Sequence, residues 1–256
     1  MIPQEKILKD GKLHAFLLGS GGPMNNEKRV ASSIAVIVNG EFILFDVGPG
    51  TYRNVDVLKL PASHLSAVFL THFHSDHIGD LGEANMLSWV NGRDKPLEVY
   101  GPKGVEKVVD GFAMAYELDT GYRVSHHGPE IANPEAGTPI SKSIEIKDPR
   151  ESVLCLDRNG LKVFAFEVKH PPIELAVGYR IEWRGRLIAI TGDTIKTDNL
   201  VNQCRNADIL FSEAISFNML TTLAKGAKRF HMDRYAKILT DIQGYHMNPT
   251  TAAELA

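Results

Sequence analysis

Four side chains that can bind a metal lie within six residues, at His72, His74, Asp76 and His77. They follow the apolar run Ala67–Leu70, which predicts a buried strand. On an extended strand end, His72 and His74 point the same way, because side chains alternate with a period of two. Imidazole nitrogen with carboxylate oxygen is the ligand set of zinc and its neighbours rather than of calcium or magnesium. The chain holds ten histidines in 256 residues, so this density predicts a metal site.

The elements around these residues are short strands separated by glycine turns. Asn39-Gly40 and Asn159-Gly160 each lie between two apolar runs, which predicts two-residue β-hairpins, and Arg184-Gly185 is a third turn of this kind. Asp76 and His77 lie where the chain is expected to turn from the strand into a helix, so they can be aimed at a second point. Helices are predicted over 78–91, 103–117, 195–206 and 232–243.

Two parts of the chain repeat one coarse pattern. Near 41–48 and again near 186–193, a glycine turn leads into an apolar strand that ends on an aspartate, Asp46 or Asp193. This pattern favours two βαβ-like halves with polar side chains at their strand ends, and therefore an α/β fold in a single domain over 1–256. The Gly- and Pro-containing stretch 118–150 is predicted to be a long polar insertion without regular structure.

The composition limits the classes of protein to consider. The chain has 28 Lys and Arg against 31 Asp and Glu, a net charge of −3, so it has no global electrostatic reason to coat nucleic acid or membrane. A hydrophobic share of 43% excludes wholesale disorder. Its apolar runs are too short to cross a bilayer, and its N-terminal residues lack a secretory pattern. Cys155 and Cys204 are too few for a disulfide framework, so a cytoplasmic protein is predicted.

The motif H-x-H-x-D-H at 72–77 resembles the signature of the metallo-β-lactamase superfamily, and the resemblance extends along most of the chain. Asp46 resembles the aspartate that supports the metal-binding loop, His170 resembles the third ligand of the first metal, and Asp193 resembles the carboxylate that bridges both metals. The segments 18–23, 178–180 and 192–194 look most like the ribonuclease Z and phosphodiesterase branch. The resemblance implies a four-layer αβ/βα sandwich, with two facing mixed sheets and helices outside.

The resemblance also implies a dinuclear centre that activates hydroxide for attack on an ester-like bond. One ion would be bound by His72, His74 and His170, the other by Asp76 and His77, with Asp193 between them. Zn²⁺ is the expected metal, with Mn²⁺ or Fe as alternatives, and no other cofactor is expected. Asp76 is in addition a candidate catalytic residue. Asp46 and Asp80 are candidates for hydrogen bonding the ligand histidines, although Asp80 could equally support the start of the following helix.

The C-terminal segment Gly244–Ala256 resembles the motif in which a histidine precedes an alanine-rich helix. There the histidine is thought to act on the leaving group, which would make His246 a general acid. In the family, this helix leads to one further strand, whose histidine completes the second metal site. The sequence ends at Ala256 without that strand, so we expect a C-terminal strand to be missing from it.

The leading hypothesis is a metal-dependent hydrolase of a phosphodiester, acting on a small anionic ester or on an RNA 3′ end, with a homodimer as a further implied partner. An RNA substrate would call for a flexible gripping arm, but 118–150 carries few basic residues before Lys142, and the basic cluster Lys225, Lys228 and Arg229 is expected to be a solvated face. The alternatives are an arylsulfatase-like hydrolase, an iron-dependent redox member with Ser75 where di-iron members have Glu, and a metal-impaired binding protein.

Overall fold

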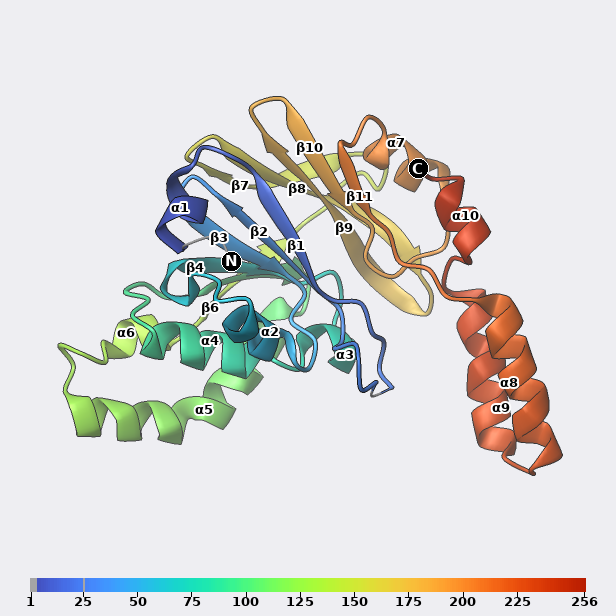
Figure 1. Ribbon diagram of the computed structural model, residues 1–256, viewed down its shortest axis with the longest axis horizontal. Coiled ribbons are helices and arrows are strands. Elements are labelled where there is room, and N and C mark those ends of the chain that lie inside the picture. Colours follow the sequence, from blue (N-terminus) through green and yellow to red (C-terminus); the bar gives the residue numbers. More distant parts are fainter. Residues whose placement is uncertain (1–3, 25) are drawn as a thin grey trace. The chain divides into compact units, whose positions relative to one another are not determined.

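The computed structural model of the chain describes residues 4–24 and 26–256. It divides into two compact units, Met1–Ile144 and Glu145–Ala256, called unit 1 and unit 2 below. Each unit contains one mixed β-sheet with helices, which confirms the predicted α/β class (Figure 1). The single domain predicted over 1–256 stays a prediction.

Unit 1 is built on a six-stranded sheet in the order β1-β2-β3-β4-β5-β6, in which β1 to β3 are antiparallel and β3 to β6 run parallel. Its strands are β1 (His14–Gly19), β2 (Ser33–Val38), β3 (Glu41–Phe45), β4 (Leu65–Phe69), β5 (Glu98–Pro102) and β6 (Ile140–Ile144). Its helices are α1 (Gln4–Lys9), α2 (Thr51–Val57), η1 (Ala62–His64), α3 (Ser75–Ile78), α4 (Leu81–Val90), α5 (Val105–His127) and α6 (Pro134–Gly137).

The parallel half of this sheet places the histidine motif. Parallel strands are joined by helical crossovers and are buried on both faces, so β3 and β4 read as nearly continuous apolar runs. Phe42 and Leu44 of β3 and Val68 of β4 pack with Val55 of α2 and Leu81 of α4 in one buried cluster. The carboxyl ends of β3 and β4 therefore lie side by side, and the residues that follow them, Asp46 and the motif, meet there.

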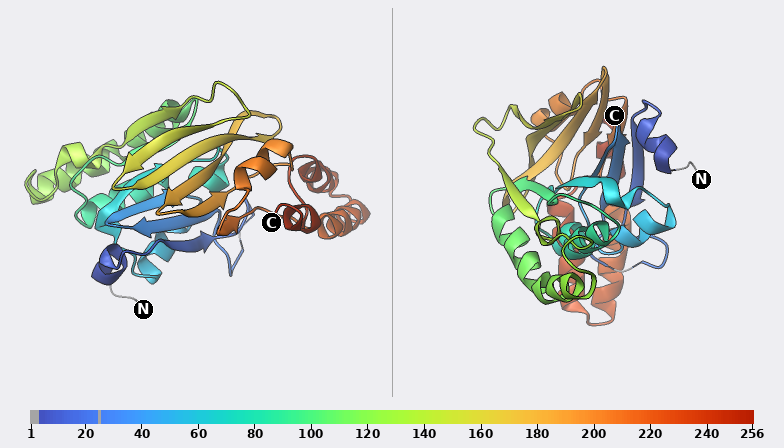
Figure 2. Two further views of the ribbon diagram at one scale, coloured as in Figure 1. Left: turned by 90° about the horizontal axis from the view of Figure 1, so that it is seen from above. Right: turned by 90° about the vertical axis from the view of Figure 1, so that its left-hand side faces the viewer.

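Unit 2 is built on a five-stranded sheet in the order β11-β10-β9-β8-β7, antiparallel except for the parallel pair β10 and β11. Its strands are β7 (Ser152–Arg158), β8 (Leu161–His170), β9 (Ile173–Trp183), β10 (Arg186–Ile190) and β11 (Ile209–Phe211). Its helices are α7 (Asp198–Cys204), α8 (Phe217–Arg229), α9 (Asp233–Asp241), η2 (Ile242–Gly244) and α10 (Pro249–Ala253). Figure 2 gives two further views of these elements.

The three predicted hairpin turns are confirmed. Asn39 and Gly40 have φ of 48° and 87°, both in the left-handed region that a type I′ turn requires. Asn159-Gly160 and Arg184-Gly185 have the same pair of positive φ angles. Each turn joins antiparallel neighbours in its own sheet: β2 to β3, β7 to β8, and β9 to β10.

The prediction of a long irregular insertion over 118–150 is wrong. Helix α5 continues to His127, and α6 and β6 follow within the same stretch. Residues 118–127 hold no proline, and Arg123 forms an ion pair with Asp119 one turn earlier at 3.0 Å. Val124 packs against a buried cluster that includes Trp89. Gly128, with φ of 78°, ends the helix. Most of the turn-forming residues of the stretch lie in 128–139, and the prediction wrongly extended the irregular structure to residues 118–127, which are helical.

The described residues include no helix long and apolar enough to cross a membrane.

Glycine substitutions test the extension of α5. A Cβ at Gly121 meets nothing within 4 Å, so we expect Gly121→Ala to stabilise the protein by roughly 0.5–1 kcal/mol and to raise Tm slightly. Gly121→Pro should lower stability by about 3 kcal/mol, because it removes a helical hydrogen bond. Thermal unfolding followed by circular dichroism measures both. A loop at this position would tolerate the proline.

Candidate functional site

The carboxylate of Asp46 organises the histidine motif of unit 1. It is buried and accepts three hydrogen bonds: from the Thr71 backbone N–H at 2.8 Å, from Thr71 Oγ1 at 2.9 Å and from His77 Nδ1 at 2.7 Å. Asp46 itself lies in the left-handed region with φ of 54°, at the point where the chain leaves β3. The backbone conformation thus turns this carboxylate toward the end of β4.

These bonds set the protonation of two buried imidazoles. The single hydroxyl proton of Thr71 is donated to Asp46, so Thr71 Oγ1 accepts from His72 Nδ1, which lies 3.0 Å away. His77 Nδ1 likewise carries a proton, because the carboxylate it contacts can only accept. In the neutral rings, Nε2 of both histidines therefore keeps its lone pair. A hydrogen bond from the other ring nitrogen is what orients metal-binding histidines in proteins.

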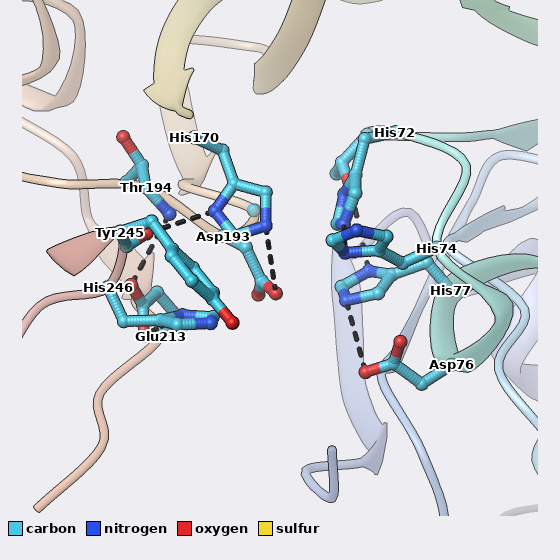
Figure 3. Close-up of polar contacts among 12 residues, drawn as sticks. His72, His74, Asp76, His77, His170, Asp193, Thr194, Glu213, Tyr245 and His246 are labelled. Atoms are coloured by element: carbon cyan, nitrogen blue, oxygen red, sulfur yellow. Dashed lines mark hydrogen bonds and ion pairs between the residues drawn. The ribbon is translucent and has the colours of Figure 1, made fainter. Parts of the chain in front are cut away.

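The four predicted ligands of unit 1 lie together (Figure 3). His74 Nδ1 is 3.0 Å from His72 Nε2, and Asp76 Oδ2 is 3.7 Å from His77 Nε2. Two imidazole nitrogens this close either share a proton or direct their lone pairs toward a common cation. His72 and His77 are buried, while His74 is exposed. This donor set fits a divalent cation of the zinc type, and the role of these residues as ligands stays a prediction.

Gly48 allows the helix that carries Asp76 to approach the end of β3. A Cβ at Gly48 would lie 2.0 Å from the Asp76 carbonyl oxygen and 2.7 Å from Ala31 Cβ, which no side chain could occupy. The His77 carbonyl accepts from the Val47 N–H at 2.8 Å and joins the same two segments. A small cavity of about 140 Å³ adjoins Asp76 and is lined by Arg29 among other residues.

Asp80 is the N-cap residue of α4, in line with one of the two expectations for it, although its side chain makes no capping hydrogen bond. Within residues 4–24 and 26–256 it hydrogen bonds to none of the motif histidines. Instead Asp80 Oδ2 accepts from the Tyr52 N–H at 3.1 Å, which ties the first turn of α2 to the start of α4. Asp46 alone fills the role of histidine acceptor that the sequence analysis offered to both aspartates.

The predicted residues of unit 2 lie where β8 and β10 end. His170, the last residue of β8, donates from Nδ1 to the Tyr245 carbonyl oxygen at 2.9 Å. A carbonyl only accepts, so Nε2 of the neutral ring carries the lone pair, as in His72 and His77. Asp193 follows β10 by three residues, and its Oδ2 lies 4.0 Å from His170 Nε2. Unit 2 therefore brings its two predicted ligands together.

Glu213 is a candidate functional residue that the sequence reasoning missed. It follows β11, is largely buried, and its Oε2 lies 3.3 Å from His246 Nδ1. Its other oxygen accepts from the backbone N–H groups of Met247, at 2.8 Å, and of Thr194, at 3.3 Å. Burial raises the pKa of Glu213, while His246 opposes that rise. The available signal was positional: Glu213 follows an apolar strand, as Asp46 and Asp193 do.

The contacts of Arg180 give that residue a structural role. Its guanidinium donates to the Gln203 carbonyl at 2.6 Å and to Glu182 at 3.1 Å. These contacts make Arg180 part of a surface ion pair with Glu182.

Comparison with known proteins places the chain in a family. The beta-lactamase superfamily domain model matches residues 41–256. Ribonuclease Z of Mycobacterium marinum is 31% identical over 243 residues, covering 94% of this chain and 80% of that protein. Ribonuclease Z of Mycobacterium bovis is 31% identical over 247 residues, covering 95% and 81%. The chain belongs to the metallo-β-lactamase superfamily, in its ribonuclease Z branch.

Solved structures agree with this membership. The crystal structure of human tRNase Z, short form, matches with a TM-score of 0.68 and 25% identity, covering 94% of this chain and 87% of that one. The resemblance drawn from the H-x-H-x-D-H motif is therefore confirmed, and so is the fold class that it implied. In this member of the ribonuclease Z branch, the strand-end carboxylates Asp46, Asp193 and Glu213 each hold or face a histidine of the family motifs.

The variant Asp46→Asn should weaken zinc binding by about 10–100-fold. The amide nitrogen of an asparagine side chain only donates, so the variant could not accept from the Thr71 backbone N–H on one side and from Thr71 Oγ1 and His77 Nδ1 on the other. Competition with a chromogenic zinc chelator at neutral pH measures the change. Asp80→Asn is the matched control, because Asp80 accepts only from the backbone of Tyr52. Equal losses in the two variants would contradict the role given to Asp46.

Proposed function

We propose that this protein hydrolyses a phosphodiester bond at the 3′ end of an RNA, with bound divalent metal ions. The observation that carries the proposal is the match to ribonuclease Z proteins along 94% of the chain. Three buried histidines, each with its Nδ1 proton donated to an oxygen, support it from the structure: His72, His77 and His170. Metal-dependent phosphodiester hydrolysis is thereby favoured over arylsulfatase-like, iron-dependent redox and metal-impaired alternatives.

The proposed ligands are the six residues of the family motifs, and the proposed ions are two Zn²⁺, with Mn²⁺ or Fe as alternatives. One ion would be held by His72, His74 and His170, the other by Asp76 and His77, with Asp193 shared between them. When bound, such ions lower the pKa of water and neutralise charge on phosphoryl oxygens. The chain's own contribution is to fix the tautomer of each imidazole and so to present the ligands without reorganisation.

Two residues are proposed to handle protons. Asp76 provides the carboxylate of α3 that can accept a proton from an attacking water. His246 is proposed as the general acid for the leaving oxygen. Glu213 supports this role, because its carboxylate lies against His246 Nδ1 and stabilises the protonated imidazole. Glu213 is itself fixed by two backbone N–H groups, so it positions His246 rather than contacting the substrate.

A homodimer and a cytoplasmic location, both expected from the sequence, stay predictions.

Metal dependence is the direct test of the proposed reaction. Protein loaded with Zn²⁺ or Mn²⁺ should hydrolyse bis(p-nitrophenyl) phosphate, and a chelator should abolish the activity. His74→Ala should lower kcat/KM by about 100-fold or more, because it removes a proposed ligand. His126→Ala, at the exposed end of α5, is the matched control and should retain full activity. Equal activity in the His74 variant and the wild type would reject the proposal.

The role of His246 is tested by comparing leaving groups. His246→Ala should lower kcat on an RNA substrate by about 10²–10⁴-fold, since the departing ribose oxygen needs a proton. The loss on bis(p-nitrophenyl) phosphate should be much smaller, because nitrophenolate leaves without protonation.

Glu213→Gln should move the alkaline limb of the kcat profile on RNA to lower pH, because the protonated imidazole loses its carboxylate partner. In the His246→Ala variant, equal losses of activity on the two substrates would show that His246 has a structural role only.

A further inference from the structure

Helices α8 and α9 form a hairpin that extends away from the sheet of unit 2 (Figures 1 and 2). They pack through an apolar cluster in which Leu220 and Ala224 of α8 meet Leu239 of α9. The hairpin is capped at its start by Ser216, whose side chain accepts from the Met219 N–H. Its thirteen residues make α8 roughly 20 Å long at about 1.5 Å per residue.

The hairpin begins shortly after Glu213 and ends shortly before His246, and these two residues contact each other. Glu213 precedes α8 by four residues, and His246 follows the short helix η2 that ends the hairpin. The Ile215 N–H donates to the Met247 carbonyl at 2.9 Å and joins the two ends. A molecule lying along the hairpin therefore extends from its turn to the imidazole that we propose as the general acid.

The hairpin has a net positive charge, whereas the chain as a whole has a net negative charge. Residues 217–241 contain five Lys or Arg and two Asp, whereas the whole chain has a net charge of −3. Lys237 pairs with Asp241 at 2.7 Å. In the part of the chain that the structure describes, no ion pair involves the remaining four basic side chains, which are all exposed: Lys225, Lys228, Arg229 and Arg234. Unneutralised cations on one projecting element fit a polyanion.

The turn of the hairpin adds exposed aromatic and apolar side chains. Phe230 is 78% exposed and Met232 is 52% exposed. Met232 also lines an open hollow together with Tyr235. His231, between Phe230 and Met232, has φ of 56°, so the turn is tight. Proteins that hold single-stranded or looped RNA combine cations for the backbone with aromatic rings on which bases stack.

We propose that the α8–α9 hairpin is an RNA-binding element, with Lys225, Lys228, Arg229 and Arg234 on the phosphates and Phe230 stacked on an unpaired base. The inference rests on the proposed function and names the surface that would hold its substrate away from the reacting bond. An anionic membrane is the other occupant that cations and an exposed Phe could suit. RNA is favoured because the hairpin starts after Glu213 and ends just before His246, the proposed general acid.

The test measures RNA affinity separately from catalysis. The probe is a fluorescein-labelled stem-loop RNA with a single-stranded 3′ tail, and binding is followed by anisotropy across a series of salt concentrations. The triple variant Lys225→Gln, Lys228→Gln, Arg229→Gln should weaken binding about tenfold or more near 0.1 M salt, and it should reduce the slope of log K against log salt by roughly two. Phe230→Ala should weaken binding about fivefold or more, and Phe230→Tyr should restore it.

A matched control loses the same charge elsewhere. Lys103→Gln, Lys107→Gln and Lys142→Gln remove three exposed cations of unit 1 and should leave RNA affinity within about twofold of the wild type. Both triple variants should retain full hydrolysis of bis(p-nitrophenyl) phosphate and an unchanged Tm.

Three results would overturn the inference: unchanged RNA affinity in the hairpin variant, an equal loss in the control, or hairpin-dependent binding to anionic phosphatidylserine vesicles in place of RNA. Failure of the wild type to hydrolyse any phosphodiester would instead count against the proposed function, since the anisotropy measurement needs no turnover.

Discussion

The site of unit 1 depends on one buried carboxylate. Asp46 accepts from the backbone of Thr71, the hydroxyl of Thr71 and the imidazole of His77 at the same time. A carboxylate with fewer partners at this depth would be strongly destabilising, because each unsatisfied lone pair would lose its hydration. The bond to His77 orients that ring directly, and the Thr71 hydroxyl that Asp46 holds orients the ring of His72. The hydrogen bonds that stabilise the loop after β4 therefore also orient the proposed ligand histidines.

In unit 2, a backbone carbonyl group orients the imidazole of the proposed ligand. His170 donates to the Tyr245 carbonyl, so a peptide oxygen replaces a carboxylate as the partner of Nδ1. His246, which follows Tyr245 in the chain, contacts Glu213 instead. Adjacent residues of one segment thus orient a proposed ligand through the main chain and present a proposed acid through a side chain. A shift of residues 245–246 would disturb both.

Much of this arrangement could be predicted from the sequence, because its determinants are local. The proximity of His72 and His74 in the segment after β4 and the three glycine turns depend on spacing within a few residues. Glu213 could not be predicted in this way, since a single Glu after a three-residue strand has no distinctive neighbours. The C-terminal half of α5 was missed because Gly121 suggested a break, whereas Val124 packs on a buried cluster that includes Trp89 of the distant helix α4.

The two ends of the α8–α9 hairpin are held together, which separates the proposed RNA-binding residues from the proposed reacting groups. The polypeptide leaves the unit 2 scaffold after Glu213 and returns just before His246, at points joined by the Ile215–Met247 hydrogen bond. An excursion that begins and ends at one place can change in length, charge or tip without moving either anchor. A change within this segment can therefore alter the proposed RNA binding while the proposed reacting groups keep their positions.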